Sequence, residues 1–283
     1  MGHLLLDACD RDCARIHPPV AFPPGGIAST VDGSNPREWR DAAISRNMDI
    51  IERLRCAAPP QEIASHSFSH IRYDEQRTDP AAVKADIEKA KRVHELFKLP
   101  FQSFVFPDNI IGFRPLLAEA GIQAYRGRSP RWFDGLPAPI HGHLHLLTYM
   151  LEVTPSPVTV TIDEAGLVNI PDSMLLIARH GMRRIVPSAK LVRMGIRGLN
   201  RAVQRGGVFH LWFHPSNFLV KMEEQLSVLD QILHHAQFLR KSGALEVLTV
   251  ADIWGRMIEA KHSSSGPTTC PLPAKISRQS GHT

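Results

Sequence analysis

Two histidines separated by three residues are the feature of this sequence that most directly suggests chemistry. His66 and His70 lie in the stretch Glu62-Ile-Ala-Ser-His-Ser-Phe-Ser-His70. On a helical turn this spacing places both imidazoles on one face, where they can bind one metal ion. An isolated pair with this spacing is more often a turn in which histidines only form hydrogen bonds. Here Ser65, Ser67 and Ser69 can orient the backbone and the imidazoles, so we interpret the pair as ligands of a divalent metal, with zinc the best fit.

Another histidine stands at the end of a predicted strand. Apolar and polar residues alternate over the segment 208–213, which predicts a strand with one apolar face. This alternation needs no catalytic explanation, and His210 shares a face with His214. We select His214 as the candidate catalytic residue because it ends the strand just before Pro215, where a sheet opens to solvent.

Three further histidines, His141, His143 and His145, alternate within one short stretch. An extended segment would place them on one side, as in a metal site. A loop or the start of a helix explains the pattern at least as well. Because nothing nearby supplies a carboxylate at a convincing spacing, we leave these histidines out of the site.

Strands and helices are predicted to alternate along most of the chain, which favours parallel strands joined by crossover helices. Asp79 and Pro80 indicate one helix start, because Asp caps a helix and Pro fits its first turn. The short strand 63–65 would place the histidine pair at the carboxyl end of a sheet, where barrels carry their catalytic residues. Predicted helices cover residues 44–57, 80–97, 115–120, 188–205 and 222–239, and predicted strands cover 63–65, 101–106, 123–125, 158–162, 208–213 and 245–250.

Length and composition predict one domain followed by a tail. Of the 283 residues 43% are hydrophobic, enough for one large core, which we place within residues 1–261. The proline- and glycine-rich segment 18–36 is predicted to be an extended loop. Residues 262–283, with hardly any large apolar groups, are predicted to be a disordered tail.

The four cysteines show no paired spacing and are interpreted as ordinary thiols. With neither a secretory leader nor an apolar run of bilayer length, we expect a cytoplasmic protein with no membrane partner.

Nucleic-acid binding is a weak alternative. The net charge of +5 is mild, and only 7% of the residues are aromatic, whereas nucleic-acid binders usually combine a basic stripe with stacking aromatics. The most basic segment is the predicted helix 188–205. Its apolar residues Leu191, Met194, Ile196 and Leu199 suggest that much of this helix is buried. We therefore expect no nucleic-acid partner.

Three segments together resemble motifs of the polysaccharide deacetylase family, also called the NodB homology domain. Residues 66–70 match its His-Ser/Thr-x-x-His motif. Phe104-Val-Phe-Pro-Asp-Asn-Ile-Ile-Gly112 resembles the third motif region, although the arginine that usually begins that motif is not present. Residues 208–217 resemble the closing motif, in which a strand delivers a histidine to the site. The order and separation of the three segments match the family over roughly residues 2–255.

The resemblance implies a fold and a set of residue roles. The fold would be an α/β distorted (β/α) barrel. In this family two histidines and one aspartate bind the metal, a neighbouring aspartate activates water, and the last histidine is the general acid. By this resemblance His66 and His70 would be metal ligands and His214 the acid, and the substrate groove would be lined by Phe106, Pro107 and Asn109.

The resemblance also implies an activity. The reaction would remove N-acetyl groups from the amino sugars of a polysaccharide or oligosaccharide, which is hydrolysis of a carbon–nitrogen bond that is not a peptide bond. Zinc with three protein ligands leaves one position for water and lowers its pKa to about 7. The alternative is a non-catalytic carbohydrate-binding descendant that keeps the groove. The sequence does not define the sugar, the metal or the oligomeric state.

One family motif does not occur in this sequence. The first motif, Thr-Phe-Asp-Asp-Gly or a variant, carries the aspartate ligand and the catalytic base on the first barrel strand. Residues 1–7 resemble the stretch after the second family strand. We therefore expect a start codon further upstream, a truncated N-terminus, or a site that uses another carboxylate such as Asp32 or Asp108. In the first two cases the barrel would lack its first strand, and the chain as written would fold poorly or be inactive.

Overall fold

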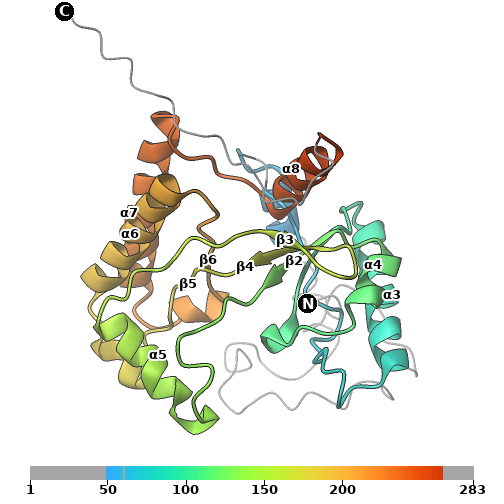
Figure 1. The fold of residues 1–283 in the computed structure, drawn as a ribbon, viewed down its shortest axis with the longest axis horizontal. Helices are drawn as coiled ribbons and strands as arrows, with labels where there is room; N and C mark the ends of the chain where they lie inside the picture. The colour runs from blue at the N-terminus through green and yellow to red at the C-terminus, as the bar shows by residue number, and fades with distance from the viewer. Residues whose placement is uncertain (1–48, 60, 264–283) are drawn as a thin grey trace, which may run out of the picture. The chain divides into compact units, whose positions relative to one another are not determined.

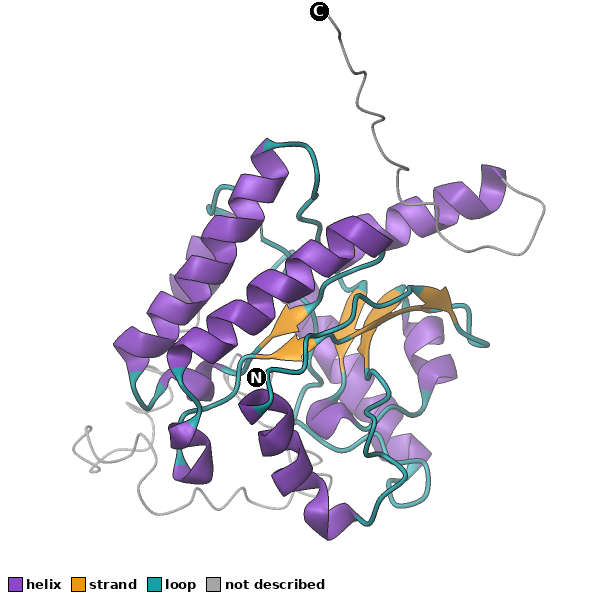
Figure 2. Cartoon of the chain, turned by 60° about the vertical axis from the view of Figure 1, so that its left-hand side comes forward, coloured by secondary structure: helices purple, strands orange, loops and turns teal. Residues whose placement is uncertain are grey.

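The computed structural model describes residues 49–59 and 61–263, which divide into two compact units (Figure 1). Among the described residues, the first unit comprises 49–126 without residue 60, together with Ile162–Val168 and Thr249–Trp254, and the second comprises Gly127–Thr161, Asn169–Leu248 and 255–263. Both contain helices and strands, so the predicted mixed α/β class is confirmed (Figure 2). The predicted loop 18–36 lies outside the described residues, as do most of the predicted tail and the start of the helix 44–57. Of that helix, residues 49–55 are helical.

Helix α3 (Pro80–Leu96) begins where the sequence predicts. The Asp79 side chain accepts a hydrogen bond from the Ala81 amide, which satisfies one of the free N–H groups of the first turn. Apolar residues at helical spacing bury one face, from Val83 to Val93. Helix α4 (Arg114–Ala120) packs beside α3 and ends at Gly121, whose φ of 103° is a left-handed conformation that glycine adopts without strain.

The first two strands of the sheet pair in parallel, as the alternation predicts. Strand β1 (Ser103–Val105) pairs with β2 (Ala124–Gly127), with Phe104 opposite Tyr125. Ser65 forms a parallel bridge to Phe104 on the other side of β1. The order along the four-stranded sheet is β1-β2-β4-β3, where β3 is Thr161–Ile162 and β4 is Val168–Pro171. Between β1 and α4 the chain makes the short 3-10 helix η3 (Pro107–Asn109).

The second unit is built on two long helices. Helix α6 (Ser188–Arg205) has the predicted bounds, and α7 (Met222–Lys241) is two residues longer than predicted. A Cβ at Gly195 of α6 would lie 2.6 Å from the Ile232 side chain, so this glycine allows α6 and α7 to approach closely. Strand β5 (Met174–Leu175) pairs in parallel with β6 (Leu211–Trp212). The unit also contains α5 (His141–Met150) and the 3-10 helices η4 (Ala138–Ile140), η5 (Gly181–Ile185) and η6 (Pro215–Phe218).

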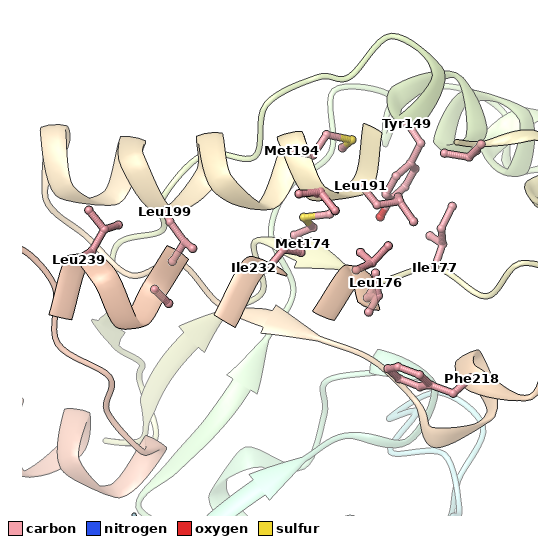
Figure 3. Close-up of a cluster of buried hydrophobic side chains, with 14 residues drawn as sticks. Tyr149, Met174, Leu176, Ile177, Leu191, Met194, Leu199, Phe218, Ile232 and Leu239 are labelled. Atoms are coloured by element: carbon pink, nitrogen blue, oxygen red, sulfur yellow. The ribbon is translucent and has the colours of Figure 1, made fainter. Parts of the chain in front are cut away.

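The core of the second unit lies between α6 and α7 (Figure 3). Leu191 and Met194 of α6 and Ile232 of α7 belong to one buried cluster, and all three are at most 2% exposed. Leu176 and Ile177, which follow β5, are fully buried in the same cluster. Burial of each such side chain contributes roughly 1.5–3 kcal/mol, so this cluster stabilises the unit.

The predicted strand 245–250 is wrong. Residues 245–249 form no strand, and Val250 begins helix α8 (Val250–Ser263). The Thr249 hydroxyl accepts from the Asp252 amide, while the Asp252 carboxylate accepts from the Thr249 amide. This reciprocal capping starts a helix and outweighs the β-propensity of Val247, Leu248 and Thr249. Because α8 continues to Ser263, the predicted tail boundary at 262 falls within its last turn. In the part of the chain that is described, no helix has the length and apolarity needed to cross a bilayer.

Candidate metal centre

His66 leaves the sheet of the first unit directly after its bridging residue. The Ser65 amide donates to the Ser103 carbonyl and the Val105 amide donates to the Ser65 carbonyl, at 2.9 and 2.8 Å. Nδ1 of His66 then lies 2.7 Å from the Val105 carbonyl oxygen. A carbonyl can only accept, so Nδ1 carries the proton and Nε2 keeps its lone pair for a metal. The predicted strand 63–65 is reduced to this one bridging residue, whose bridge to Phe104 is parallel, and His66 follows it directly.

The electrostatics of His66 also suit a ligand. Burial lowers the pKa of this imidazole, and the positive charges of His70 and Arg126 lower it further. The hydrogen bond to the Val105 carbonyl acts in the opposite direction and is outweighed. A lowered pKa keeps the ring neutral near pH 7, which is the protonation state that binds a metal.

The two imidazoles are neighbours, but the backbone that brings them together is not the predicted helical turn. The ring centroids of His66 and His70 lie 4.9 Å apart at an interplanar angle of 82°. Residues 66–70 form a loop in which Ser67 and His70 have φ values of 66° and 61°. Left-handed conformations are uncommon outside glycine and cost energy, so other contacts must hold this loop.

A buried aspartate on helix α3 provides those contacts. Asp86 is 1% exposed. Its carboxylate accepts from the Ser67 hydroxyl at 2.7 Å, the Phe68 amide at 3.0 Å, the Ser69 amide at 3.0 Å and the Ser69 hydroxyl at 2.5 Å. Each oxygen is therefore hydrogen-bonded to the loop, which compensates for burying the charge. Asp86 fixes the loop that carries both histidines.

Two further contacts complete this network. The Tyr73 hydroxyl donates to Asp86 at 3.1 Å, and burial together with the Asp86 charge raises the pKa of Tyr73. The His70 amide donates to the Ser67 hydroxyl oxygen at 3.0 Å. The serines thus hold the backbone, as predicted, and reach the imidazoles only through it. Asp86 was missed, although a charged residue between Val83 and Ile87 on the buried face of α3 is a signal that the sequence contains.

Within the described residues, the histidine pair gains no third candidate ligand. Among residues 49–59 and 61–263, no group of three or more His, Cys, Asp or Glu side chains is placed to hold a metal ion. The alternative carboxylate Asp108 is exposed and forms an ion pair with Arg72 at 2.7 Å. The other alternative, Asp32, lies outside the described residues. His66 and His70 could supply two of the three or four protein ligands that a zinc site needs.

The predicted groove residues differ in exposure. Phe106 is 1% exposed, and its ring packs against Tyr73 and Tyr125 at centroid distances of 5.6 and 5.4 Å. Pro107 is also buried. Asn109 is partly exposed and its side-chain oxygen accepts a hydrogen bond from Arg126. Of the three, Asn109 is the residue whose side chain can meet a ligand.

His214 belongs to the second unit. It lies two residues beyond the end of β6 and directly before η6, so it does not end the strand as predicted, and it is exposed. Its ring lies 5.4 Å from that of Trp212, whose Nε1 donates to Asp172 at 3.0 Å. His210 is partly buried, and its Nδ1 lies 3.2 Å from the Pro171 carbonyl oxygen. Exposure thus distinguishes His214 from His210 as a proton donor.

The basic face of α6 is occupied by the segment that follows α5. Arg193 and Arg197 donate to the Glu152 carboxylate at 2.6 and 2.7 Å, and Arg201 donates to the Thr154 carbonyl at 2.8 Å. The hydrogen bond from Arg193 is the largest cause that lowers the pKa of Glu152 to about 2. These contacts use donors that a nucleic-acid backbone would need, which argues against that partner.

Comparison with models of known families, with curated proteins and with solved structures finds no match for this chain.

Proposed function

We propose that this chain is a metal-dependent hydrolase of the polysaccharide deacetylase type, which removes N-acetyl groups from amino sugars. The observation that carries the proposal is the histidine pair of the first unit. His66 presents Nε2 as a lone-pair donor beside the ring of His70, and a buried carboxylate holds the loop between them. Loops that serve only as connections rarely combine left-handed residues, a buried charge and an oriented imidazole.

The finer fold in this proposal is a distorted (β/α) barrel. Support comes from three parallel segments that follow one another in the sequence, namely Ser65, β1 and β2. Helix α3 connects the first to the second, and α4 connects the second to the third. This is the repeating unit of α/β barrels, which carry catalytic residues at the carboxyl ends of their strands.

The roles of the residues follow from their contacts. When bound, a divalent ion such as zinc supplies a Lewis acid and a water of lowered pKa. His66 and His70 would hold that ion, the Val105 carbonyl sets the tautomer of His66, and Asp86 fixes the loop. Asn109 would bind the sugar. The role of His214 as the acid that protonates the leaving amine remains a prediction from the resemblance.

Zinc titration followed by calorimetry tests the metal site in the full chain. We expect zinc to bind. His66→Ala should weaken binding by at least about tenfold, because it removes one of the two histidine ligands. His234→Ala, which removes an exposed histidine on α7, is the matched control and should leave the affinity unchanged. Equal zinc affinity in the wild type and His66→Ala would refute the metal site.

Acetate release from an acetylated chito-oligosaccharide tests the reaction. We expect release that a chelator or His66→Ala abolishes. The second candidate is a carbohydrate-binding protein without catalysis, which is favoured by the presence of only two metal ligands among the described residues. Oligosaccharide binding that persists with chelator, together with no acetate release, would establish that candidate and contradict the hydrolase.

A further inference from the structure

Helix α7 carries two apolar stripes, and among the described residues the inner one is buried while most of the outer one is exposed. The inner stripe, which includes Val228, Ile232 and Leu239, packs on α6 in the core of the second unit. The outer stripe consists of Met222, Leu226, Leu229 and Leu233. Leu226 is 50% exposed and Leu233 is 53% exposed, while Leu229 is partly buried.

The spacing of the outer stripe is that of a helix-pairing seam. Its residues are separated by four, three and four positions, which is the heptad pattern by which one helix packs against another. The surface around Leu226, Ser227, Leu229, Asp230 and Leu233 is open, and within the described part of the chain no other element lines it. Exposed contiguous apolar surface of this kind marks an interaction site.

The charges at the two ends of α7 indicate which partner fits. Glu223 lies in the first turn, and Arg240 and Lys241 lie in the last. Within the described residues, none of these three side chains forms an ion pair. A helix that is acidic at one end and basic at the other is complementary to itself when two copies run antiparallel.

We propose that the outer stripe of α7 docks against the same stripe of a second copy of this chain, antiparallel across a two-fold axis. An axis beside the middle of α7 places Leu229 of one copy against Leu233 of the other. The same register brings Glu223 of each copy beside Arg240 of its partner. An isologous contact buries both stripes at once and pairs both sets of terminal charges.

Sedimentation equilibrium of the full chain measures the dimer. One helix pair is a small interface, so we expect a Kd on the order of 10 µM. Leu226→Glu combined with Leu233→Glu should raise the Kd at least about tenfold, because each substitution places a carboxylate in the apolar seam between the two helices. Gln231→Glu adds one negative charge on another face of α7 and is the control; its Kd should equal that of the wild type.

Charge reversal tests the antiparallel orientation. Glu223→Arg should weaken the dimer by about three- to tenfold, since it places three cations together. Adding Arg240→Glu and Lys241→Glu to that variant should restore the wild-type Kd. Circular dichroism verifies that each variant remains folded. A wild type that is monomeric at all concentrations, or a dimer that responds to neither the stripe nor the charge variants, would overturn the proposal.

Discussion

Two histidine-rich segments of this chain have opposite surroundings. In residues 65–70, both imidazoles lie in a loop whose backbone is held by a buried carboxylate. In residues 141–145, the histidines begin an ordinary helix, α5. The His141 ring nitrogen Nε2 lies 2.7 Å from the Leu136 carbonyl, and the His145 ring packs 5.1 Å from that of Tyr149.

The difference shows that histidine clustering alone does not define a site. The second segment confirms the helix-start interpretation, since the alternating histidines 141, 143 and 145 point in different directions on a helix. Burial and the charges of Arg131 and Arg183 lower the pKa of His145 to about 4. Positive charges lie near both segments, since Arg126 also lowers the pKa of His66. The first segment differs because its two rings are adjacent and its loop is held by the Asp86 carboxylate.

Among the variants of the first segment, removal of the Asp86 carboxylate should lower stability and zinc affinity the most. Asp86→Ala leaves two backbone amides and three hydroxyls without their acceptor in a buried location, so we expect a loss of about 3 kcal/mol or more in the free energy of unfolding. Because the loop is no longer fixed, zinc affinity should fall by at least about tenfold. Urea unfolding and zinc calorimetry measure the two quantities.

The control for this variant lies on the same helix. Glu88 is exposed on α3, and Glu88→Ala should change stability by no more than about 0.5 kcal/mol. Asp86→Asn keeps the volume and one oxygen acceptor, so its loss should fall between the two. If Asp86→Ala retained full zinc affinity, the loop would not depend on this network.

The contribution of the second segment to the free energy of unfolding should depend on pH. The folded-state pKa of His145 is about 4, below the value of 6.5 expected in the unfolded chain. Between these values the unfolded chain binds more protons, so stability is fully present above pH 6.5 and is lost as the pH falls toward 4. We expect His145→Leu to flatten the pH dependence of the unfolding free energy in this window.

The exposed neighbour His143 provides the comparison for that measurement. His143→Leu should leave the slope between pH 4 and 6.5 unchanged, because the ring is exposed on the same helix. Urea unfolding at pH 4.5, 5.5 and 7 suffices to measure both variants. An equal slope in the wild type and His145→Leu would show that burial of this ring does not disfavour its protonation.

Much of the helical structure could be predicted because its signals are local. Helix α6 has the predicted bounds Ser188–Arg205, and α3 starts at its predicted Asp79 cap. Strands were harder to predict from the sequence. Strands β5 and β6 have two residues each, and their pairing depends on partners distant in the sequence. At residues 245–250 apolar propensity predicted a strand, while the Thr249 and Asp252 capping pair, a local signal that was available, started a helix.

The site was predictable in its residues but not in its backbone. The spacing of His66 and His70 correctly indicated two adjacent rings, yet a helical turn was the wrong geometry. Neither serine nor histidine signals a left-handed conformation by its type. That conformation depends on Asp86, which lies 16 residues beyond His70 and contacts the loop only after α3 has packed. Tertiary contacts therefore set the loop geometry.

The smallest losses of stability and zinc affinity should come from removing the Tyr73 hydroxyl, which donates to Asp86 from outside the loop. Tyr73→Phe removes one hydroxyl that donates to Asp86 at 3.1 Å and keeps the ring that packs on Phe104 at 5.1 Å. We expect a loss of about 1 kcal/mol in unfolding free energy, the usual net contribution of one hydrogen bond. Zinc affinity should stay within about twofold, since four loop donors still hold the carboxylate. A loss of zinc binding as large as that of Asp86→Ala would mean that the hydroxyl, and not the loop contacts, positions Asp86 and through it both histidines.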